Sequence, residues 1–288
     1  MELYKYQGAG NDFLIGDNRD GGISLTKDNI VSLCDRRYGI GADGIMLLEN
    51  PSASCSGAAS PSYGMVYYNS DGSGGMMCGN GGRCIAAFAA FLGISGECFT
   101  AADGLHSAKI ISVCGKTSVV RLGMKDVEEI TACGAPGGEV PPGYFLDTGT
   151  RHFVQLVQSV AACDVAAAGR RIRTAGEFAP AGVNVNFVQP DGDALRVRTY
   201  EKGVEAETFA CGTGITASAI AVWHHAANLP ENERGPFRGL FRTDAGGRVS
   251  AEVRALRDSL SVDFVPCGSG ASGVHLTGPA TYIGKIII

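Results

Sequence analysis

Short alternating runs of hydrophobic and polar residues dominate the chain, and two longer segments are apolar throughout. The alternation has the period of a half-buried β-strand. The apolar segments, residues 83–92 and 213–225, have the length of helices and lack a polar face, so we expect both helices to be buried. A third helix is predicted at residues 26–37, where Thr26 is a suitable N-cap. Strands are predicted at residues 3–13, 14–17, 45–48, 65–69, 109–113, 118–122, 144–147, 153–157, 183–188, 195–200, 249–253 and 259–265.

The order of these features repeats along the chain. A glycine-rich turn, strands, a cysteine–glycine loop and an apolar helix follow one another in residues 7–92 and again in residues 147–225. Phe13 and Phe153 close the two turns at corresponding places. Such a duplication predicts two similar halves with a cleft between them, each half a buried helix surrounded by strands. Residues 51–62 are rich in Ser, Ala, Pro and Gly, which is typical of a surface loop.

Composition and charge narrow the function classes. The chain has 288 residues, 45% of them hydrophobic, which is enough for a large core and favours two domains over one. The net charge of −5 comes without a basic cluster, so we expect no nucleic-acid partner. No apolar core of a signal peptide and no run of ~18 apolar residues is visible. We therefore expect a cytoplasmic protein that does not bind membranes.

The cysteines are expected to be reduced and to bind no metal. Chains of this size without a visible leader usually keep their thiols reduced, although the ten cysteines would permit disulfides. No CxxC or HxxxH spacing occurs, so the sequence predicts no metal site. Most cysteines are interpreted as small core residues.

Cys78 and Cys211 differ from the other cysteines because each stands directly before glycines and a predicted helix, in MCGNGGR (77–83) and ACGTG (210–214). Backbone N–H groups at a helix N-terminus favour a thiolate and bind anions. The alternative interpretation is that both cysteines are small buried residues, but packing gives no reason for the same glycines to occur twice. We therefore predict two thiols that face a common anionic ligand.

Two thiols in this arrangement suit an inversion at carbon. One group removes a proton from one face of the carbon, and the other returns a proton to the opposite face. A carbon next to a carboxylate is a weak acid, so the negative charge that develops must be stabilised. The N–H groups of two helix N-termini would supply fixed donors for that charge.

At these loops the chain resembles the diaminopimelate epimerase family, the cofactor-independent amino-acid epimerases of lysine and peptidoglycan synthesis. The resemblance runs nearly end to end, and the two cysteine loops together make it specific. The motifs that carry it are GAGNDF (8–13), GIGADG (39–44), NSDGS (69–73), CGNGGRC (78–84), YEKG (200–203) and CGTG (211–214).

The resemblance implies that LL-2,6-diaminopimelate is converted to the meso form without a cofactor. Cys78 and Cys211 would be the base and the acid, exchanging these roles with the handedness of the substrate. His152 and Glu201 would be the polar groups beside the thiols. The implied substrate contacts are Gly79, Asn80, Gly212 and Thr213 for the reacting α-carboxylate, Asn11 and Glu201 for the α-amino group, and Asn69, Asn184 and Lys202 for the distal end.

The fold that the resemblance implies is α/β (α+β), with two pseudo-symmetric domains, each a set of strands wrapped around a central helix, and the active site in the cleft between them. The expected domains are residues 1–119 with 276–288, carrying Cys78, and residues 120–275, carrying Cys211. The family is usually dimeric, so a homodimer is expected.

The chain departs from the family pattern on the side of distal recognition. The pattern has Asn-Pro-His or Ser-Pro-His where this chain has Thr150, Arg151 and His152, and it has arginine where this chain has Lys202. Lysine offers a point charge where arginine offers a planar fork. One hypothesis is that Arg151 replaces the missing guanidinium.

Three alternatives stay open. The departures permit a racemase or epimerase of a different amino acid. A Cys–His hydrolase would use Cys78 with His152, but it would not need a second cysteine loop. A non-catalytic binding relative would have little reason to retain both thiols.

Overall fold

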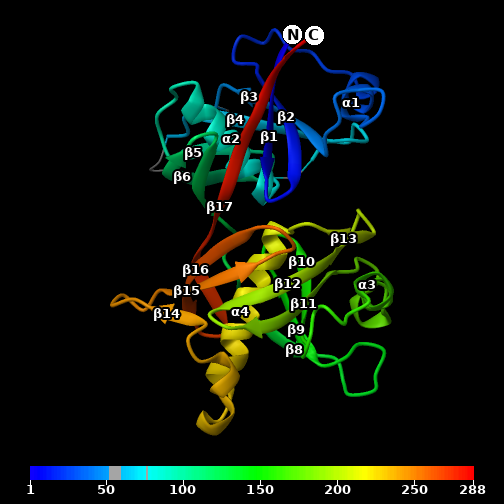
Figure 1. The fold of residues 1–288 in the computed structure, drawn as a ribbon, viewed down its shortest axis with the longest axis vertical. Coiled ribbons are helices and arrows are strands. Elements are labelled where there is room, and N and C mark those ends of the chain that lie inside the picture. The colour runs from blue at the N-terminus through cyan, green and yellow to red at the C-terminus, as the bar shows by residue number, and fades with distance from the viewer. Residues whose placement is uncertain (52–59, 76) are drawn as a thin grey trace. The chain divides into compact units, whose positions relative to one another are not determined.

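The computed structural model describes residues 1–51, 60–75 and 77–288, which form two compact units (Figure 1). Unit 1 comprises Met1–Gly123 and Thr277–Ile288, and unit 2 comprises Met124–Leu276. The predicted mixed α/β architecture is confirmed, since each unit combines strands with a largely buried helix. Most of the loop predicted at residues 51–62 lies outside the described residues. In the described ranges, no helix has both the length and the apolar character needed to cross a membrane.

Unit 1 is a sheet that closes on itself around helix α2 (Gly79–Phe91). Its strands pair in chain order from β1 to β7, and both β1 and β7 pair with β17. The pairing of β1 with β17 places the two chain termini side by side, as Figure 1 shows. The strands are β1 (Glu2–Gly8), β2 (Asn11–Asp17), β3 (Gly44–Glu49), β4 (Tyr63–Asn69), β5 (Cys98–Ala101), β6 (Gly104–Cys114), β7 (Thr117–Gly123) and β17 (Gly270–Ile287).

Helix α2 begins four residues earlier than the sequence predicts, because its glycine run is helical. Glycine costs about 1 kcal/mol relative to alanine inside a helix. Close packing explains why glycine is nevertheless present: a Cβ at Gly82 would lie 3.2 Å from both methyl groups of Leu122. Every residue from Gly79 to Ala89 is buried, as predicted for this apolar segment.

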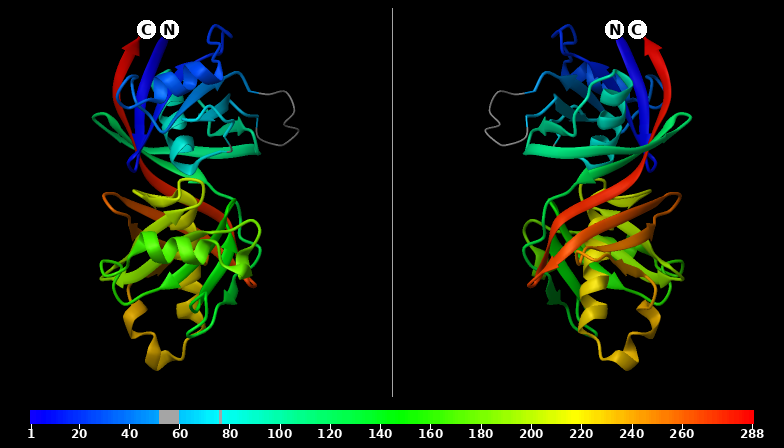
Figure 2. Two further views of the ribbon diagram at one scale, coloured as in Figure 1. Left: turned by 90° about the vertical axis from the view of Figure 1, so that its right-hand side faces the viewer. Right: turned by 90° about the vertical axis from the view of Figure 1, so that its left-hand side faces the viewer.

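Unit 2 surrounds helix α4 (Gly212–Asn228) in a similar way. Strand β9 pairs antiparallel with β10, β10 parallel with β11, β11 antiparallel with β12, and β12 parallel with β15. The helix packs against β9 to β12, β15 and β16, and it is drawn in yellow in Figures 1 and 2. The strands are β8 (Thr131–Cys133), β9 (Gly143–Asp147), β10 (Arg151–Leu156), β11 (Asn184–Asp191), β12 (Ala194–Glu201), β13 (Ala206–Thr208), β14 (Phe241–Thr243), β15 (Val249–Arg254) and β16 (Ser259–Cys267); the short 3₁₀ turns are η1 (Gly176–Phe178), η2 (Glu231–Glu233) and η3 (Gly235–Phe237).

A second helix in each unit joins a pair of adjacent parallel strands. Helix α1 (Lys27–Cys34) connects β2 to β3, and the predicted cap is confirmed, since the Thr26 hydroxyl accepts from the backbone N–H of Asn29. Helix α3 (Val165–Arg173) connects β10 to β11 and lies on the outside of the strands in Figure 2. Helix α3 was not predicted, although Asp164 is a suitable N-cap and three arginines stand in its last turn.

Strand register corrects the correspondence between the two halves. On β2 and β3, Phe13 pairs with Gly44. The next residue pair on the same face of these two strands includes Met46, whose side chain contacts the first turn of α2 at Gly81. On β10 and β11, His152 pairs with Asn184, and the next residue pair on the same face of these two strands includes Asn186.

Asn186 meets the first turn of α4 at Gly214, just as Met46 meets Gly81 in α2. By face, Phe13 therefore corresponds to His152. The alignment of Phe13 with Phe153 is wrong by one residue, because Phe153 belongs to the core on the α3 side of the sheet.

Candidate active site

Cys78 and Cys211 are the N-cap residues of α2 and α4, which confirms that each cysteine directly precedes a helix. Both have extended backbone angles, with φ −105° and ψ 127° for Cys78 and φ −97° and ψ 110° for Cys211. Neither side chain makes a capping hydrogen bond to its own helix, and cysteine is not among the residues that cap well. The first-turn N–H groups of both helices are thus arranged as in anion-binding helix N-termini.

Asn11 lies beside Cys78 in unit 1. Its side-chain nitrogen is 3.9 Å from the Cys78 sulfur. Its side-chain oxygen is buried and has no hydrogen-bond partner among the described residues. A buried acceptor without a donor costs about 1–3 kcal/mol. The position therefore suits a ligand that brings a donor, such as an ammonium group.

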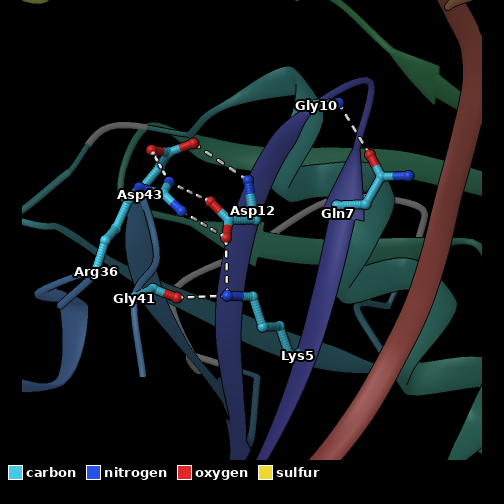
Figure 3. Close-up of polar contacts among 7 residues, drawn as sticks. All are labelled: Lys5, Gln7, Gly10, Asp12, Arg36, Gly41 and Asp43. Atoms are coloured by element: carbon cyan, nitrogen blue, oxygen red, sulfur yellow. Dashed lines mark hydrogen bonds and ion pairs between the residues drawn. The ribbon is translucent and has the colours of Figure 1, made fainter. Parts of the chain in front are cut away.

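A network of charged groups holds the turn that carries Asn11 (Figure 3). The carboxylate of Asp12 accepts from both terminal nitrogens of Arg36, at 3.1 and 2.6 Å, and lies 2.9 Å from the Lys5 ammonium. Arg36 also donates to Asp43 at 2.6 Å, and Asp43 accepts from the backbone N–H of Asp12. Burial of Asp12 raises its pKa, but the hydrogen bonds from Arg36 and Lys5 outweigh it and lower the pKa below its usual value.

Arg83 connects the first turn of α2 to strand β17 in the sheet of unit 1. The guanidinium is fully buried and donates to the side-chain oxygen of Asn80 at 2.8 Å and to the Gly79 carbonyl at 3.2 Å. Its Nε donates to the carbonyl of Pro279 on β17. Two of the predicted carboxylate contacts, Gly79 and Asn80, are therefore fixed by one side chain to which the sequence interpretation gave no role.

The Cys211 sulfur stands at the end of a chain of hydrogen bonds in unit 2. It lies 3.4 Å from the Thr213 hydroxyl, which accepts from the Thr150 hydroxyl at 3.1 Å. Thr150 in turn lies 2.9 Å from Nε2 of His152. The side-chain nitrogen of Asn186 is 3.1 Å from Nδ1 of the same imidazole. His152 thus reaches Cys211 through two threonine hydroxyls.

Burial keeps the His152 imidazole neutral. The side chain is fully buried, and desolvation lowers its pKa from 6.5 to about 3, although the Asp147 carboxylate acts in the opposite direction. Gly214 allows this close packing, because a Cβ there would lie 3.3 Å from Cε1 of His152 and 2.3 Å from Oδ1 of Asn186. A neutral imidazole can orient a chain of hydrogen bonds but supplies no positive charge.

The predicted distal residues of unit 2 are joined around Asn184. Its side-chain nitrogen donates to the Arg151 carbonyl at 3.2 Å and to the Thr150 hydroxyl at 3.4 Å. Its side-chain oxygen accepts from the backbone N–H of Lys202 at 2.8 Å, and the Lys202 ammonium donates to the Ala181 carbonyl at 3.0 Å. Asn184 therefore links the loop after β12 to Thr150, the central residue in the chain of hydrogen bonds that leads to Cys211.

Other predicted residues have separate local partners. Glu201, at the end of β12, accepts from the Thr208 hydroxyl at 3.0 Å. Asn69, at the end of β4, donates to the Ser73 hydroxyl at 3.0 Å. The Arg151 guanidinium lies 5.1 Å from the centre of the Phe145 ring. Because side chains alternate along a strand, Arg151 points to the face of β10 opposite His152.

Asn186 and Thr199 were missed by the sequence interpretation. Thr199 is buried and donates to Oδ1 of Asn186 at 2.9 Å. The available signal was the pair of asparagines Asn184 and Asn186, which place two amides on one face of the otherwise apolar segment 183–188. Among the described residues, no group of three or more His, Cys, Asp and Glu side chains is placed to hold a metal ion.

Comparison with known proteins identifies the family. The family model described as "Diaminopimelate epimerase" matches residues 3–102 and 144–239. The chain is 46% identical to the diaminopimelate epimerase of Flavobacterium psychrophilum over 291 residues, which cover 98% of each chain. It is 42% identical to the diaminopimelate epimerase of Aquifex aeolicus over 231 residues, covering 76% of this chain and 80% of the relative.

Solved structures of more distant proteins share the fold. A Bacillus anthracis phenazine biosynthesis protein of the PhzF family matches with a TM-score of 0.69 and 12% identity, covering 100% of this chain and 99% of that chain. A probable proline racemase from Agrobacterium radiobacter K84 matches with a TM-score of 0.66 and 16% identity, covering 100% and 92%. The match of the family model and the full-length similarity to the Flavobacterium enzyme together show that this chain belongs to the diaminopimelate epimerase family.

Proposed function

We propose that the protein epimerises LL-2,6-diaminopimelate to meso-2,6-diaminopimelate without a cofactor, using Cys78 and Cys211 as a pair of acid–base groups. Full-length similarity to an enzyme named diaminopimelate epimerase supports the reaction and the substrate. The observation that carries the mechanism is the position of both cysteines as N-caps of the two buried helices. As the family resemblance implies, the proposal includes a cytoplasmic homodimer.

The proposed reaction is a proton transfer through one α-carbon. The thiolate of one cysteine takes the α-proton, and the electron pair of the broken C–H bond moves into the adjoining carboxylate. The other cysteine then gives its S–H proton to the opposite face of the carbon and is left as the thiolate. The enzyme ends with its protonation states exchanged, so the reverse reaction uses the same groups in opposite roles.

The helix N-termini stabilise the charge that develops on the carboxylate. Their donors are the backbone N–H groups of Gly79 and Asn80 in α2 and of Gly212 and Thr213 in α4. Such donors are fixed before the reaction starts and need no reorganisation during it. A buried guanidinium, that of Arg83, holds the first turn of α2 in place for this task.

Recognition of the remaining groups follows from the same residues. The buried oxygen of Asn11 would accept from the α-ammonium group, together with the carboxylate of Glu201. At the distal end, Asn69, Asn184 and Lys202 would contact the second amino-acid centre. Lys202 supplies a point charge there where the family pattern has an arginine fork.

The test is proton exchange at the α-carbon. Purified protein is incubated with LL-diaminopimelate in heavy water, and NMR follows deuterium incorporation and the appearance of the meso isomer. We expect both with diaminopimelate, and neither with L-lysine, L-glutamate or L-proline under the same conditions. Exchange into another amino acid but not into diaminopimelate would show that the substrate is wrong. Activity that survives Cys211→Ala would exclude the two-thiol mechanism.

A further inference from the structure

The hydrogen bonds around His152 have a defined direction, which begins at Asn186. One hydrogen of the Asn186 amide is donated to the Phe153 carbonyl at 3.1 Å, and a carbonyl can only accept. On the other side of the amide, Oδ1 accepts from the Thr199 hydroxyl. These two contacts fix which amide atom is nitrogen. The second amide hydrogen therefore points at Nδ1 of His152, which must be the acceptor.

The direction continues to the Cys211 sulfur. With Nδ1 as acceptor, the proton of the neutral imidazole is on Nε2 and is donated to Thr150. Thr150 also accepts from the Asn184 amide, so its own hydroxyl hydrogen goes to Thr213. The Thr213 hydroxyl has then accepted one hydrogen bond and has its hydrogen for the sulfur 3.4 Å away.

Three features show that this chain of hydrogen bonds is built into unit 2. Asn186 and His152 are both fully buried, so water does not compete for their hydrogen bonds. At the equivalent positions of unit 1 by register, Met46 and Phe13 are apolar. Gly214 has no Cβ where one would overlap Asn186, which leaves room for the amide against the helix that carries Cys211.

We propose that Asn186 and Thr150 are positioning residues for Cys211, which hold His152 as the neutral Nε2–H tautomer and direct a chain of hydrogen bonds that ends with the Thr213 hydroxyl donating to the Cys211 sulfur. A donor on sulfur favours the thiolate over the thiol. This inference deepens the proposed function and rests on it for the catalytic consequence, but the tautomer and the state of the thiol are measurable without substrate.

The first experiment determines which ring nitrogen of His152 carries the proton. Long-range ¹H–¹⁵N NMR of the whole protein, with His152 assigned by the loss of its signals in His152→Gln, distinguishes a protonated nitrogen from an unprotonated one. We expect Nδ1 unprotonated and Nε2 protonated. In Asn186→Asp the carboxylate accepts at Nδ1, and we expect that nitrogen to become protonated. A wild-type protein with Nδ1 protonated would overturn the proposal.

The second experiment measures the reactivity of the Cys211 thiol. Peptide mass spectrometry gives the rate of alkylation by iodoacetamide at Cys211, with Cys78 as the internal reference. We expect Thr150→Val to slow alkylation of Cys211 about 10-fold and to leave Cys78 unchanged, because the lost donor destabilises one thiolate only. Thr150→Ser should restore the rate. Equal rates of Cys211 alkylation in Thr150→Val and wild type would refute the proposed effect of the hydrogen bonds on the sulfur.

The third experiment separates positioning from substrate contact. With diaminopimelate, we expect Thr150→Val to lower kcat about 10- to 100-fold and to change KM less than about threefold. Ser218→Ala removes another buried hydroxyl of α4, which donates to the Gly214 carbonyl of its own helix, and should leave kcat within about twofold. A raised KM with unchanged kcat in Thr150→Val would make Thr150 a substrate contact and contradict the proposal. An inactive wild type with the expected tautomer would instead refute only the proposed reaction.

Discussion

The surroundings of the two cysteines differ although the framework that carries them is repeated. In unit 1 an amide reaches sulfur directly, from Asn11 to Cys78, and a buried guanidinium braces the helix start. In unit 2 the residue at the corresponding register position, Thr150, is linked to Cys211 through the Thr213 hydroxyl. Each thiol is therefore supported by different chemistry on the same arrangement of strands and helix.

The two units therefore share the backbone positions of the repeat, but the side chains at those positions have different roles. The residues that face the first helical turn are apolar in unit 1, where Met46 meets Gly81. They are polar in unit 2, where Asn186 meets Gly214. A buried apolar contact needs only volume, whereas a buried amide needs all of its hydrogen bonds. Unit 2 is thus the more exacting of the two environments.

The largest expected effect tests whether the two thiols are equally necessary. We expect Cys78→Ala and Cys211→Ala each to lower kcat about 10³-fold or more, because each removes one of two required acid–base groups. The measurement is epimerisation of diaminopimelate at saturating substrate. A loss in one variant only would mean that the two sites are not a pair.

The next prediction compares equivalent glycines. In Gly214→Ala the new methyl would meet Asn186 at 2.3 Å, so the amide must move and lose hydrogen bonds. We expect the free energy of unfolding to fall by about 1–3 kcal/mol.

Gly81→Ala is the matched control. Its methyl would lie 3.1 Å from the flexible sulfur of Met46, and alanine gains about 1 kcal/mol of helix propensity. Urea unfolding of both variants should therefore show a clear loss only for Gly214→Ala. An equal loss at both sites would contradict the contrast drawn between the units.

A third prediction concerns acid. The pKa of His152 falls from 6.5 to about 3 on folding, so between these values the unfolded chain binds a proton that the folded chain does not. The free energy of unfolding is then highest above pH 6.5 and decreases toward pH 3, by up to about 1.4 kcal/mol per pH unit. Burial lowers the pKa of His224 and of His225 as well, which adds to this trend in unit 2.

Unit 1 supplies the reference for this measurement. The lowered pKa of Asp12 contributes stability that is present above pH 3.8 and is lost only as the pH falls through the lower folded value. Hydrogen exchange at pH 7 and pH 5 should therefore show loss of protection in peptides of α4 and β10 before peptides of α2 and β1. Earlier loss in unit 1 would count against the prediction.

The smallest expected effect concerns Arg151. Its guanidinium lies over Phe145, on the face of β10 opposite His152, which does not favour the hypothesis that it replaces the family's distal arginine. We expect Arg151→Ala to leave KM for diaminopimelate unchanged and to lower the free energy of unfolding by about 0.5–1 kcal/mol through the lost cation–π contact. A large rise in KM would restore the hypothesis.

The sequence predicts the buried helices and the cysteine positions well, because apolar segments and glycine-flanked thiols are local signals. It places the start of α2 too late, since a glycine run resembles a loop unless the packing against Leu122 is known. It gives no role to Asn186 or Arg83, whose importance depends on burial and on partners far along the chain. Side-chain partners of this kind follow from strand register, which the pattern alone misassigned at Phe153.

Strand β17 runs from unit 2 into unit 1, which bears on how the protein folds. Residues Thr277–Ile288 complete the sheet of unit 1 by joining β1 to β7, yet the whole of unit 2 separates them in sequence from the rest of unit 1. Until this segment is in place, β1 and β7 each lack a neighbouring strand on one edge. Closing the sheet of unit 1 therefore needs a contact between segments far apart in sequence, which is a slow kind of step in folding.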